Sequence, residues 1–358
     1  MSVLAAIGVL ALLIVVHELG HFAAARLQGI HVNRFSIGFG PILWKYQGSQ
    51  TEYAIRGFPL GGFVGFPDDD PDSNIPADDP DLLRNRPLLD RAIVISAGVI
   101  ANLVFAYLLL VVQFGTVGAF NGFDYQPGVL VPRLTSDSSP AAIGGIRPGD
   151  VILSVDGQKL AASKEATTLL TQTIQSKPNQ KITFTVQRGD RELALTVTPE
   201  QGDKGKGQIG VQLQPLGKAL YKRPDNFFGA FTLGAEEFQK IVSLTLQGFG
   251  QLVSNFQRTA SQVAGPVAIV ALGADIAHKD ATALFHFAAL ISINLAIINI
   301  LPLPALDGGQ LTFLLIEGLR GQPLPTRIQD GVMQTGLMLL LGLGIFLIIR
   351  DTANLWIR

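Results

Sequence analysis

The chain of 358 residues contains no cysteine. Without thiols it forms no disulfides and binds no metal through thiolates, so any metal must be held by nitrogen and oxygen atoms of histidine, aspartate or glutamate. Charged residues are also scarce, at 15% of the chain against about 25% in ordinary soluble proteins, whereas hydrophobic residues make up 48%. This composition indicates a membrane protein with several spans.

A strong charge of one sign is missing as well. The net charge is -1 and no long basic run occurs, which argues against a nucleic-acid partner. The chain shows no internal repeat, which argues against a transporter built from two related halves.

Four apolar segments are long enough to cross a bilayer core, which takes about 20 helical residues. They are residues 3–25, 92–114, 285–301 and 332–349. The third stops at Pro302 and Pro304, and a helix broken at membrane depth is tolerated where it lines a cavity. We expect the first to be a retained transmembrane helix, because it lacks the basic start and the cleavage site of a signal peptide.

The first long loop divides into two halves of different composition. Residues 35–66 are rich in glycine, aromatic and alternating apolar residues, which predicts short strands and tight turns. Residues 67–83 are acidic and rich in proline, and we interpret them as a solvated flexible linker. A calcium site is disfavoured there, because the spacing lacks the central glycine and the last glutamate of an EF-hand loop.

Two further regions separate the second and third spans. Residues 120–215 contain strand-like runs with turn residues between them, which predicts a separate water-soluble domain. Apolar residues then recur at helical spacing over residues 227–256. This pattern fits an amphipathic helix on the membrane surface, or one that packs against the soluble domain.

The segment HELGH lies inside the first span. His17 and His21 are four residues apart, so on a helix both imidazoles reach one ion, and Glu18 is one step around, beside a water that the metal activates. This is the arrangement of a zinc hydrolase in which the glutamate is the base. A polar cluster that merely joins two helices is the alternative, but ionisable groups inside a span are costly and usually functional.

A catalytic zinc needs a third protein ligand and one open position. Asp307, in NILPLPALDGG, follows the broken span and precedes two glycines, and we expect it to be that ligand. The alternative is an aspartate that caps the next helix. His31 lies just past the first helix, and we expect His278 and His286 to be surface or interface residues.

With these motifs the chain resembles the site-2 protease family of intramembrane zinc metalloproteases, in its bacterial RseP-like branch with one PDZ domain. The resemblance covers almost the whole chain. It rests on HELGH, RPLLDRAIVISAGVIANLVFA, IRPGDVILSVDGQ, GPVAIV and LISINLAIINILPLPALDGG. It implies that Zn²⁺ is bound by His17, His21 and Asp307 and that Glu18 is the catalytic base.

The resemblance also implies substrate-binding residues. Those upstream of Asp307, at the end of the third span and just after it, are Asn299, Pro302 and Pro304, in a region expected to contact unwound substrate. Gly38, Gly40 and residues 56–64 look like the membrane-reentrant β-hairpin of the family, and its candidate contacts are Gly57, Phe58, Gly61 and Gly62. Such a hairpin can pair with the substrate by strand addition. Asn102 matches an asparagine of the second span, for which a role in packing is at least as plausible.

The PDZ-like region has an unusual order, because RPGDVILSVDG comes early and IGVQL comes last. This order suggests a circularly permuted domain whose carboxylate-binding loop is Ile209, Gly210 and Val211. The domain either binds peptides or excludes substrates with large external parts.

The expected fold is a multi-span α-helical membrane protein of about four transmembrane helices, with a membrane-reentrant β-hairpin and an inserted α+β PDZ-like domain. Its expected parts are residues 1–118, the protease part with HELGH; 119–216, the PDZ-like domain; 217–282, the amphipathic helix and a connector; and 283–358, the protease part with LDGG.

The expected function is cleavage of single-span membrane proteins in or near their transmembrane segments. Anti-sigma factors and remnant signal peptides are examples of such substrates, and a site-1 protease would act beforehand. The alternative is a catalytically silent scaffold that gathers partners through its PDZ domain. Arginines in the first long loop and in residues 320–327 place the active site towards the cytoplasm and the PDZ-like domain outside a bacterial inner membrane.

Overall fold

The structure is a computed structural model that describes residues 2–70, 73–202, 205–259 and 263–357. The chain divides into two compact units. The first, here called the membrane unit, comprises Met1–Gly118 and Arg223–Arg358, and the second, called the inserted domain, is Ala119–Lys222. The predicted end of the domain at residue 216 falls inside its last strand, which continues to Lys222.

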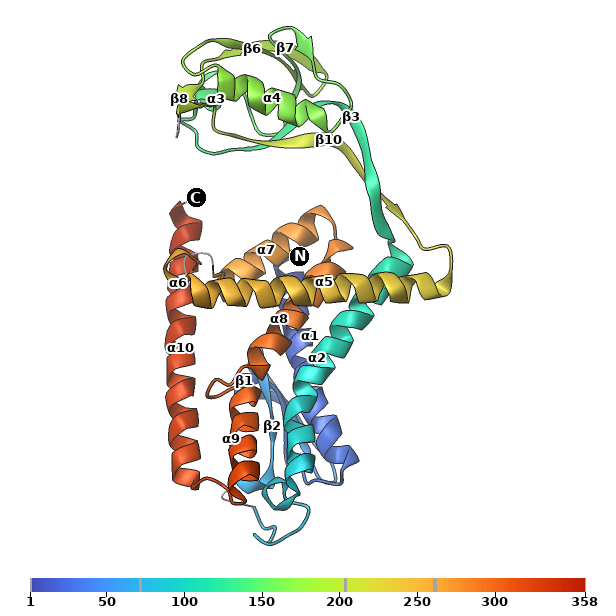
Figure 1. Cartoon of the computed structure of the whole chain (residues 1–358), viewed down its shortest axis with the longest axis vertical. Helices are drawn as coiled ribbons and strands as arrows, with labels where there is room; N and C mark the ends of the chain where they lie inside the picture. Colours follow the sequence, from blue (N-terminus) through green and yellow to red (C-terminus); the bar gives the residue numbers. More distant parts are fainter. Residues whose placement is uncertain (1, 71–72, 203–204, 260–262, 358) are drawn as a thin grey trace. The chain divides into compact units, whose positions relative to one another are not determined.

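Four helices in the described ranges are long and apolar enough to cross a membrane, as the sequence predicted. They are α1 (Ser2–Leu27), α2 (Leu88–Thr116), α8 (Ala283–Ile300) and α10 (Thr326–Ile357). The remaining helices of this unit are α5 (Phe227–Ser254), α6 (Phe256–Thr259), α7 (Pro266–Lys279) and α9 (Asp307–Arg320), shown in Figure 1.

Helices α1 and α2 approach each other closely because small residues face each other. A Cβ built on Gly20 would lie 2.7 Å from the Cβ of Ala101 and would also collide with the backbone oxygen of Ala97. In membranes, where apolar side chains gain little by leaving lipid, such small residues let helix backbones pack tightly. The second helix therefore lies directly against the helix face that carries HELGH.

The amphipathic helix is α5, and its apolar face packs on α2 and α8 within the membrane unit (Figure 1). Ile241 is buried together with Leu110 of α2 and Ile293 of α8. Other apolar side chains of α5, including Leu244 and Val253, are exposed.

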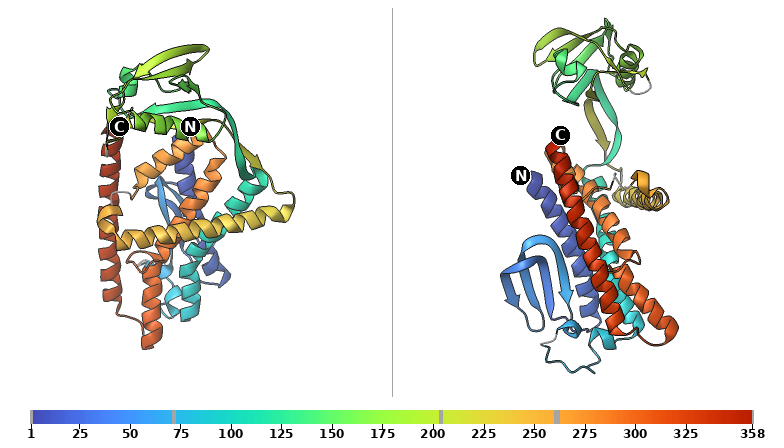
Figure 2. Two further views of the ribbon diagram at one scale, coloured as in Figure 1. Left: turned by 45° about the horizontal axis from the view of Figure 1, so that its top comes forward. Right: turned by 90° about the vertical axis from the view of Figure 1, so that its left-hand side faces the viewer.

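The first long loop folds into β1 (Arg34–Gln47) and β2 (Glu52–Gly65), as its composition predicted, beside α1 in Figure 2. Residues 34–37 pair in parallel with residues 52–55 and, on their other side, in the antiparallel sense with residues 62–65. Residues 42–47 pair antiparallel with residues 52–56. Residues 62–65 are thus paired along one edge only in this sheet.

Within the described residues 67–70 and 73–83, the acidic segment is not the loose linker that its composition suggested, and residues 71 and 72 lie outside the described residues. It contains the short 3₁₀ helices η1 (Pro67–Asp69) and η2 (Leu83–Asn85). Asp70 pairs with Arg34 at 3.0 Å, Asp68 pairs with Arg84 at 3.2 Å, and Leu82 is only 1% exposed. Arg34 is distant in sequence from the carboxylate that it binds and Arg84 is nearer to its own, and composition alone reveals neither ion pair.

The inserted domain is an α+β fold with its own hydrophobic core. One sheet has the order β10–β3–β4–β6–β7, with β5 paired to β4. These strands are β3 (Ala119–Leu134), β4 (Val151–Val155), β5 (Gln158–Lys159), β6 (Ile182–Arg188), β7 (Arg191–Val197) and β10 (Val211–Lys222). The remaining elements are α3 (Pro140–Ile143), α4 (Glu165–Ser176), β8 (Glu200–Gln201) and β9 (Gly207–Gln208).

A buried carboxylate cross-links this domain. The Asp150 side chain is 1% exposed and accepts two hydrogen bonds of 2.8 Å from the guanidinium of Arg188 and one of 2.8 Å from the backbone N–H of Arg147. Burial would raise the pKa of this carboxyl, but the Arg188 and Arg147 hydrogen bonds outweigh burial and hold the pKa of Asp150 below its ordinary value.

Candidate metal centre and active site

The two histidines of HELGH lie on the buried face of α1. His17 is 7% and His21 is 9% exposed, and their Nε2 atoms are 3.2 Å apart. The i, i+4 spacing places the rings one helical turn apart on the same side, as expected. The helix continues past them because residues 22–27 are helix-compatible, and it ends at Leu27, two residues before Gly29, which has φ +75.

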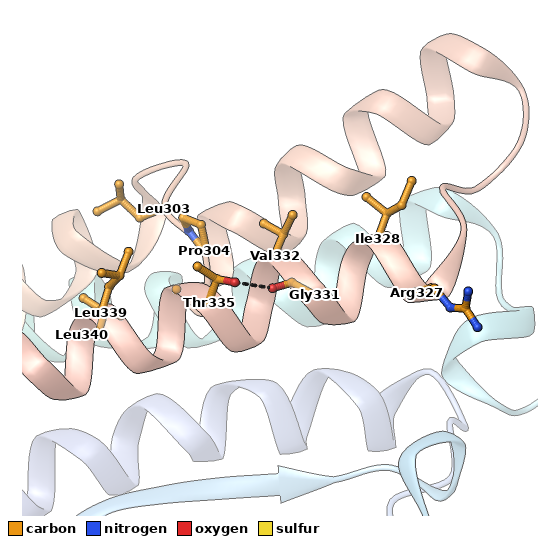
Figure 3. A pocket seen from close by; sticks show the side chains of 10 residues that line it. Leu303, Pro304, Arg327, Ile328, Gly331, Val332, Thr335, Leu339 and Leu340 are labelled. Atoms are coloured by element: carbon orange, nitrogen blue, oxygen red, sulfur yellow. Dashed lines mark hydrogen bonds between the residues drawn. The ribbon is translucent and has the colours of Figure 1, made fainter.

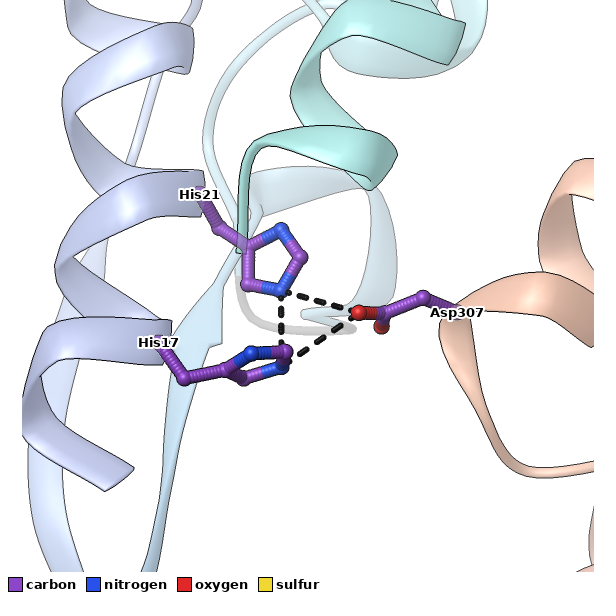
Figure 4. A group of neighbouring side chains, drawn as sticks. All are labelled: His17, His21 and Asp307. Atoms are coloured by element: carbon purple, nitrogen blue, oxygen red, sulfur yellow. Dashed lines mark hydrogen bonds and ion pairs between the residues drawn. The ribbon is translucent and has the colours of Figure 1, made fainter. Parts of the chain in front are cut away.

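Asp307 approaches both histidines from the other end of the chain (Figure 4). Its Oδ2 atom is 3.3 Å from Nε2 of His17 and 3.5 Å from Nε2 of His21. Asp307 is the first residue of α9, whereas the capping position is occupied by Leu306. The aspartate therefore turns its side chain towards the histidines, and the alternative of a capping aspartate does not describe it.

An ion pair between α2 and α9 helps to hold Asp307 in place. Arg91 donates from Nη1 and Nη2 to the two carboxylate oxygens of Glu317, at 2.7 and 3.0 Å. Both side chains are 17% exposed, so the bidentate pair is largely shielded from water. It ties α9 to the helix that packs against α1.

The environment of the imidazoles fixes which nitrogens face inward. The Nδ1 atom of His21 donates to the backbone oxygen of Val94 at 2.8 Å, which leaves its Nε2 atom directed at Asp307. Around His17, the side-chain Nδ2 of Asn102 lies 3.2 Å from Nδ1 and that of Asn299 lies 3.2 Å from Nε2. Asn299 thus joins the cluster, whereas Asn102 lies behind it.

Glu18 lies at the boundary between α1 and the small sheet. Its carboxylate accepts a hydrogen bond from the backbone N–H of Val64 and interacts electrostatically with His17, His21 and Asp307. A Cβ built on Gly62 would lie 2.9 Å from Cγ of Glu18, so glycine lets the strand backbone lie directly over the glutamate. The singly paired edge of β2 therefore meets the glutamate of HELGH.

These atoms form a site that suits a cation. The carboxylate Oδ2 of Asp307 is buried and accepts no hydrogen bond within the described ranges, although two imidazole nitrogens are within 3.5 Å. The three ligand atoms lie within 4.8 Å of one another. A buried carboxylate oxygen that faces two nitrogen lone pairs is costly unless a positive charge lies among them.

The four predicted substrate-contact residues of the hairpin have different surroundings. Gly62 lies beside Glu18, a Cβ built on Gly57 would lie 3.4 Å from Cγ of Pro41, and Gly61 lies against the ring of Phe39. Phe58 is 64% exposed. Only the end of β2 that contains Gly62 and Val64 is shown in contact with the site residues.

Of the two prolines before Asp307, Pro304 lies at a groove on α10. Pro304 and Leu303 line it together with residues of α10 from Arg327 to Leu340, and its volume is about 610 Å³ (Figure 3). Ala305, the next residue, has φ +66 and donates its N–H to Sδ of Met333 at 3.3 Å. Pro302 is exposed.

In the inserted domain, Ile209, Gly210 and Val211 line a cavity of about 360 Å³. Thr171, Ile174 and Gln175 of α4 form the opposite wall. Gly210 has φ +71, and its oxygen accepts a 2.9 Å hydrogen bond from the N–H of Thr135.

The other histidines lie outside the cluster of His17, His21 and Asp307. His31 is 3.5 Å from Asp79 and belongs, with Asp81, to a half-buried group in which Arg86 pairs with Asp81 at 3.6 Å. His286, at 40% exposure, is 3.9 Å from Glu237 of α5.

Sequence reasoning missed three features of the site. They are the contact of Asn102 with His17, the close approach of Gly98 to both rings, and the ion pair of Arg91 with Glu317. The run of small residues near Gly98 in the second span is a signal for close helix packing, but it does not identify the partner.

Comparisons with known proteins agree with this architecture. The chain matches the family described as Peptidase family M50 over residues 5–343. A protein of Nostoc sp., named as a candidate zinc metalloprotease, is 65% identical over 356 residues, which cover 99% of this chain and 97% of that protein. The chloroplastic membrane metalloprotease ARASP of Arabidopsis thaliana is 50% identical, with 99% and 79% covered.

Among solved structures, the PDZ domain of the SdrC-like protein from Listeria innocua is 26% identical. The match covers 24% of this chain and 92% of the Listeria innocua chain, with a TM-score of 0.21.

Proposed function

This chain belongs to peptidase family M50 and is an intramembrane metalloprotease, and on that premise we propose that it cuts single-span membrane proteins with Zn²⁺ held by His17, His21 and Asp307. The observation that carries the proposal is the convergence of two imidazole nitrogens and one buried carboxylate oxygen with no donor of the described chain on that oxygen. This donor set, nitrogen and oxygen without sulfur, is one that catalytic zinc accepts.

Bound there, zinc supplies a Lewis acid that activates water and polarises the carbonyl of the peptide bond. Glu18 is the base that takes a proton from the attacking water and later gives it to the leaving amine. Its hydrogen bond from Val64 supports this role, because it orients the carboxylate beside the cluster rather than into it.

The substrate segment would be held as an extended strand. A transmembrane helix satisfies its amide groups internally, so cleavage requires that it be unwound and that the freed groups find new partners. The edge of residues 62–65 offers such partners next to Glu18, which supports strand addition at a membrane-reentrant hairpin with Gly57, Phe58, Gly61 and Gly62. Asn299, Pro302 and Pro304 would contact the same segment from the other side.

The inserted domain would act before cleavage. Its cavity beside Ile209, Gly210 and Val211 suits the capture of a peptide end by a PDZ-like carboxylate-binding loop, and its bulk suits the exclusion of substrates with large external parts. A site-1 protease would remove those parts beforehand.

The proposed location is a bacterial inner membrane, with the active site towards the cytoplasm and the inserted domain outside. The arginines of the first long loop and of residues 320–327 support this orientation. The lipid bilayer is therefore a partner of the chain, and nucleic acid is not. The rival function, a silent scaffold, is disfavoured because both histidines, the glutamate and the aspartate are present and adjacent.

The test is cleavage of a model single-span substrate by the purified, detergent-solubilised protein, with zinc content measured in parallel. Glu18→Gln should keep zinc and lose roughly 10²–10⁴-fold in rate, because only the proton-transfer group changes. Equal rates for wild type and Glu18→Gln would remove Glu18 as the base. Wild type that binds no zinc and cuts no substrate would favour the scaffold.

A further inference from the structure

His17 has an amide on each of its ring nitrogens. Asn102 of α2 is 0% exposed and its Nδ2 lies 3.2 Å from Nδ1, while Nδ2 of Asn299 lies 3.2 Å from Nε2. A neutral imidazole has one N–H and one nitrogen with a lone pair, whereas an imidazolium has two N–H groups. Two amide N–H groups therefore cannot both donate to this ring.

The position of Nε2 decides which nitrogen is the acceptor. Nε2 of His17 faces Nε2 of His21 at 3.2 Å and Oδ2 of Asp307 at 3.3 Å, in the proposed zinc site. A metal at that place requires the lone pair on Nε2, and the same lone pair can accept the N–H of Asn299 when no metal binds it. The proton of His17 must then be on Nδ1.

A proton on Nδ1 needs an acceptor, and Asn102 is the group beside it. The Oδ1 atom of Asn102 is buried and has no hydrogen-bond partner in the described part of the chain, so nothing there fixes the oxygen where it lies. Half a turn of the amide places Oδ1 on Nδ1–H at the same separation, since the two ends of an amide have nearly the same shape.

We propose that Asn102 is a positioning residue whose side-chain oxygen accepts the Nδ1–H of His17 and thereby keeps Nε2 of His17 free to bind the metal. The inference rests on the proposed zinc site. It assigns to Asn102 what the backbone oxygen of Val94 does for His21, so one face of α2 sets both tautomers.

Other residues around this face of α2 also help to position the two rings and the amide. Val94, Gly98 and Asn102 are successive positions four residues apart on α2. A Cβ on Gly98 would lie 2.7 Å from Cε1 of His21 and 2.8 Å from Cε1 of His17, so glycine lets the helix reach both rings. Ser292 of α8 donates to the backbone oxygen of Asn102 at 2.9 Å and fixes the helix turn that carries the amide.

The test is zinc affinity of the full-length protein in detergent, measured by competition with a chelator of known affinity. Asn102→Leu removes the hydrogen bond at similar volume, whereas Asn102→Asp leaves only acceptor oxygens. Outer partners of zinc-binding histidines contribute roughly 10–100-fold in affinity, so Asn102→Leu should lose that much and Asn102→Asp should retain the wild-type affinity. Ser292→Ala removes the support of the same turn and leaves the amide in place, so it should lose less zinc affinity than Asn102→Leu.

An equal loss of affinity in Asn102→Asp and Asn102→Leu would overturn the inference, because the amide N–H or simple packing would then be what matters. An unchanged affinity in Asn102→Leu would overturn it as well. If Asn102→Leu does not fold, Asn102→Ala takes its place with the same expected loss.

A direct readout uses ¹⁵N NMR of the histidine-labelled, zinc-loaded wild type, which has only five histidines. Nδ1 of His17 should be protonated and Nε2 metal-bound, and the reverse assignment would contradict the inference. Wild type that binds zinc with the reverse assignment rejects this inference alone, whereas wild type that cannot be loaded with zinc rejects the proposed function too.

Discussion

Asp150 of the inserted domain and Asp307 of the membrane unit are both buried carboxylates, yet their surroundings differ. Asp150 receives three hydrogen bonds of 2.8 Å, two of them from the guanidinium of Arg188. Asp307 faces two imidazole nitrogens, and within the described ranges its buried Oδ2 accepts no hydrogen bond. The first carboxylate is paired with a permanent cation of the chain, and the second faces imidazoles, which carry a positive charge only when they are protonated.

The difference separates a structural charge from a functional one. A saturated carboxylate such as Asp150 stabilises the fold around it, and its removal should leave chemistry elsewhere untouched. An unsaturated one such as Asp307 contributes little to stability by itself, and its removal should abolish metal binding and catalysis.

Asp307→Asn should give the largest effect on catalysis. The amide removes the negative charge and offers a neutral oxygen at best, so zinc affinity should fall by more than the roughly 10–100-fold that outer partners contribute, and cleavage should be lost. Chelator competition and cleavage of a single-span substrate measure the two effects. Asp150→Asn serves as the control of the same chemistry, and cleavage by Asp307→Asn at the wild-type rate would break the comparison.

Gly98→Ala should have the second-largest effect on zinc affinity and on the cleavage rate. The new methyl group would meet the rings of His21 and His17, so both ligands must move. A displacement of about 1 Å at reacting groups can cost about 10²-fold in rate, and zinc affinity should fall in parallel. Gly115→Ala, on the same helix, meets its nearest neighbour, Cβ of Ala230, at an ordinary 3.8 Å and should behave as wild type. Equal activity of the two variants would show that the site tolerates the shift.

Gly336→Ala on α10 should have a moderate effect. Its Cβ would lie 2.8 Å from the carbonyl carbon of Pro304, three residues before Asp307, so the loop or the helix must give way. We expect a roughly tenfold lower cleavage rate, within the range known for misplacement away from the chemistry. Gly342→Ala, with no atom within 4 Å in the described structure, is the matched control. A defect of the same size in both variants would assign it to α10 itself.

Asp150→Asn should leave zinc affinity and the cleavage rate unchanged. It should instead destabilise the inserted domain by roughly 1–3 kcal/mol, because the neutral amide removes the negative charge that pairs with Arg188, whose side chain is 30% exposed. Hydrogen exchange of peptides from β4 and β6 in the full-length protein would show faster exchange in the variant. Loss of zinc in Asp150→Asn would contradict the separation of the two carboxylates.

The same carboxylate predicts a pH dependence. The pKa of Asp150 is lower in the folded domain than the ordinary value of about 3.9, so its stabilising effect is present above that value and is lost as the pH falls through the folded pKa. Protection of the β4 and β6 amides in wild type, corrected for the pH dependence of intrinsic exchange, should therefore fall as the pH drops through the folded pKa, and protection in Asp150→Asn should depend less on pH.

The sequence predicted the elements that depend on local pattern. Long apolar runs predicted α1, α2, α8 and α10, and the spacing of His17 and His21 predicted two imidazoles on one helix face. Asp307 is the predicted third ligand because a broken span precedes it and two glycines follow it, and this pattern is also local. Its actual approach to the histidines depends on the packing of α9 and on Arg91, and no local pattern encodes that contact.

What the sequence did not reveal are pairings between distant residues. The acidic segment after β2 has the composition of a linker, but Arg34 and Arg84 bind its carboxylates. Asn102 is one polar residue in an apolar span, and only the crossing of α1 and α2 shows that it meets His17. Such contacts need the three-dimensional packing of helices, which periodicity alone does not determine.

The most direct test of the central claim is X-ray absorption spectroscopy at the zinc edge of the purified wild-type protein and of Asp307→Asn. The account predicts one zinc in wild type with two imidazole nitrogens and oxygen ligands at about 2.0–2.2 Å, and loss of that signal in Asp307→Asn after dialysis against chelator. Wild type that binds no zinc after incubation with zinc would contradict the account. A zinc signal with the same ligands in Asp307→Asn would contradict it as well.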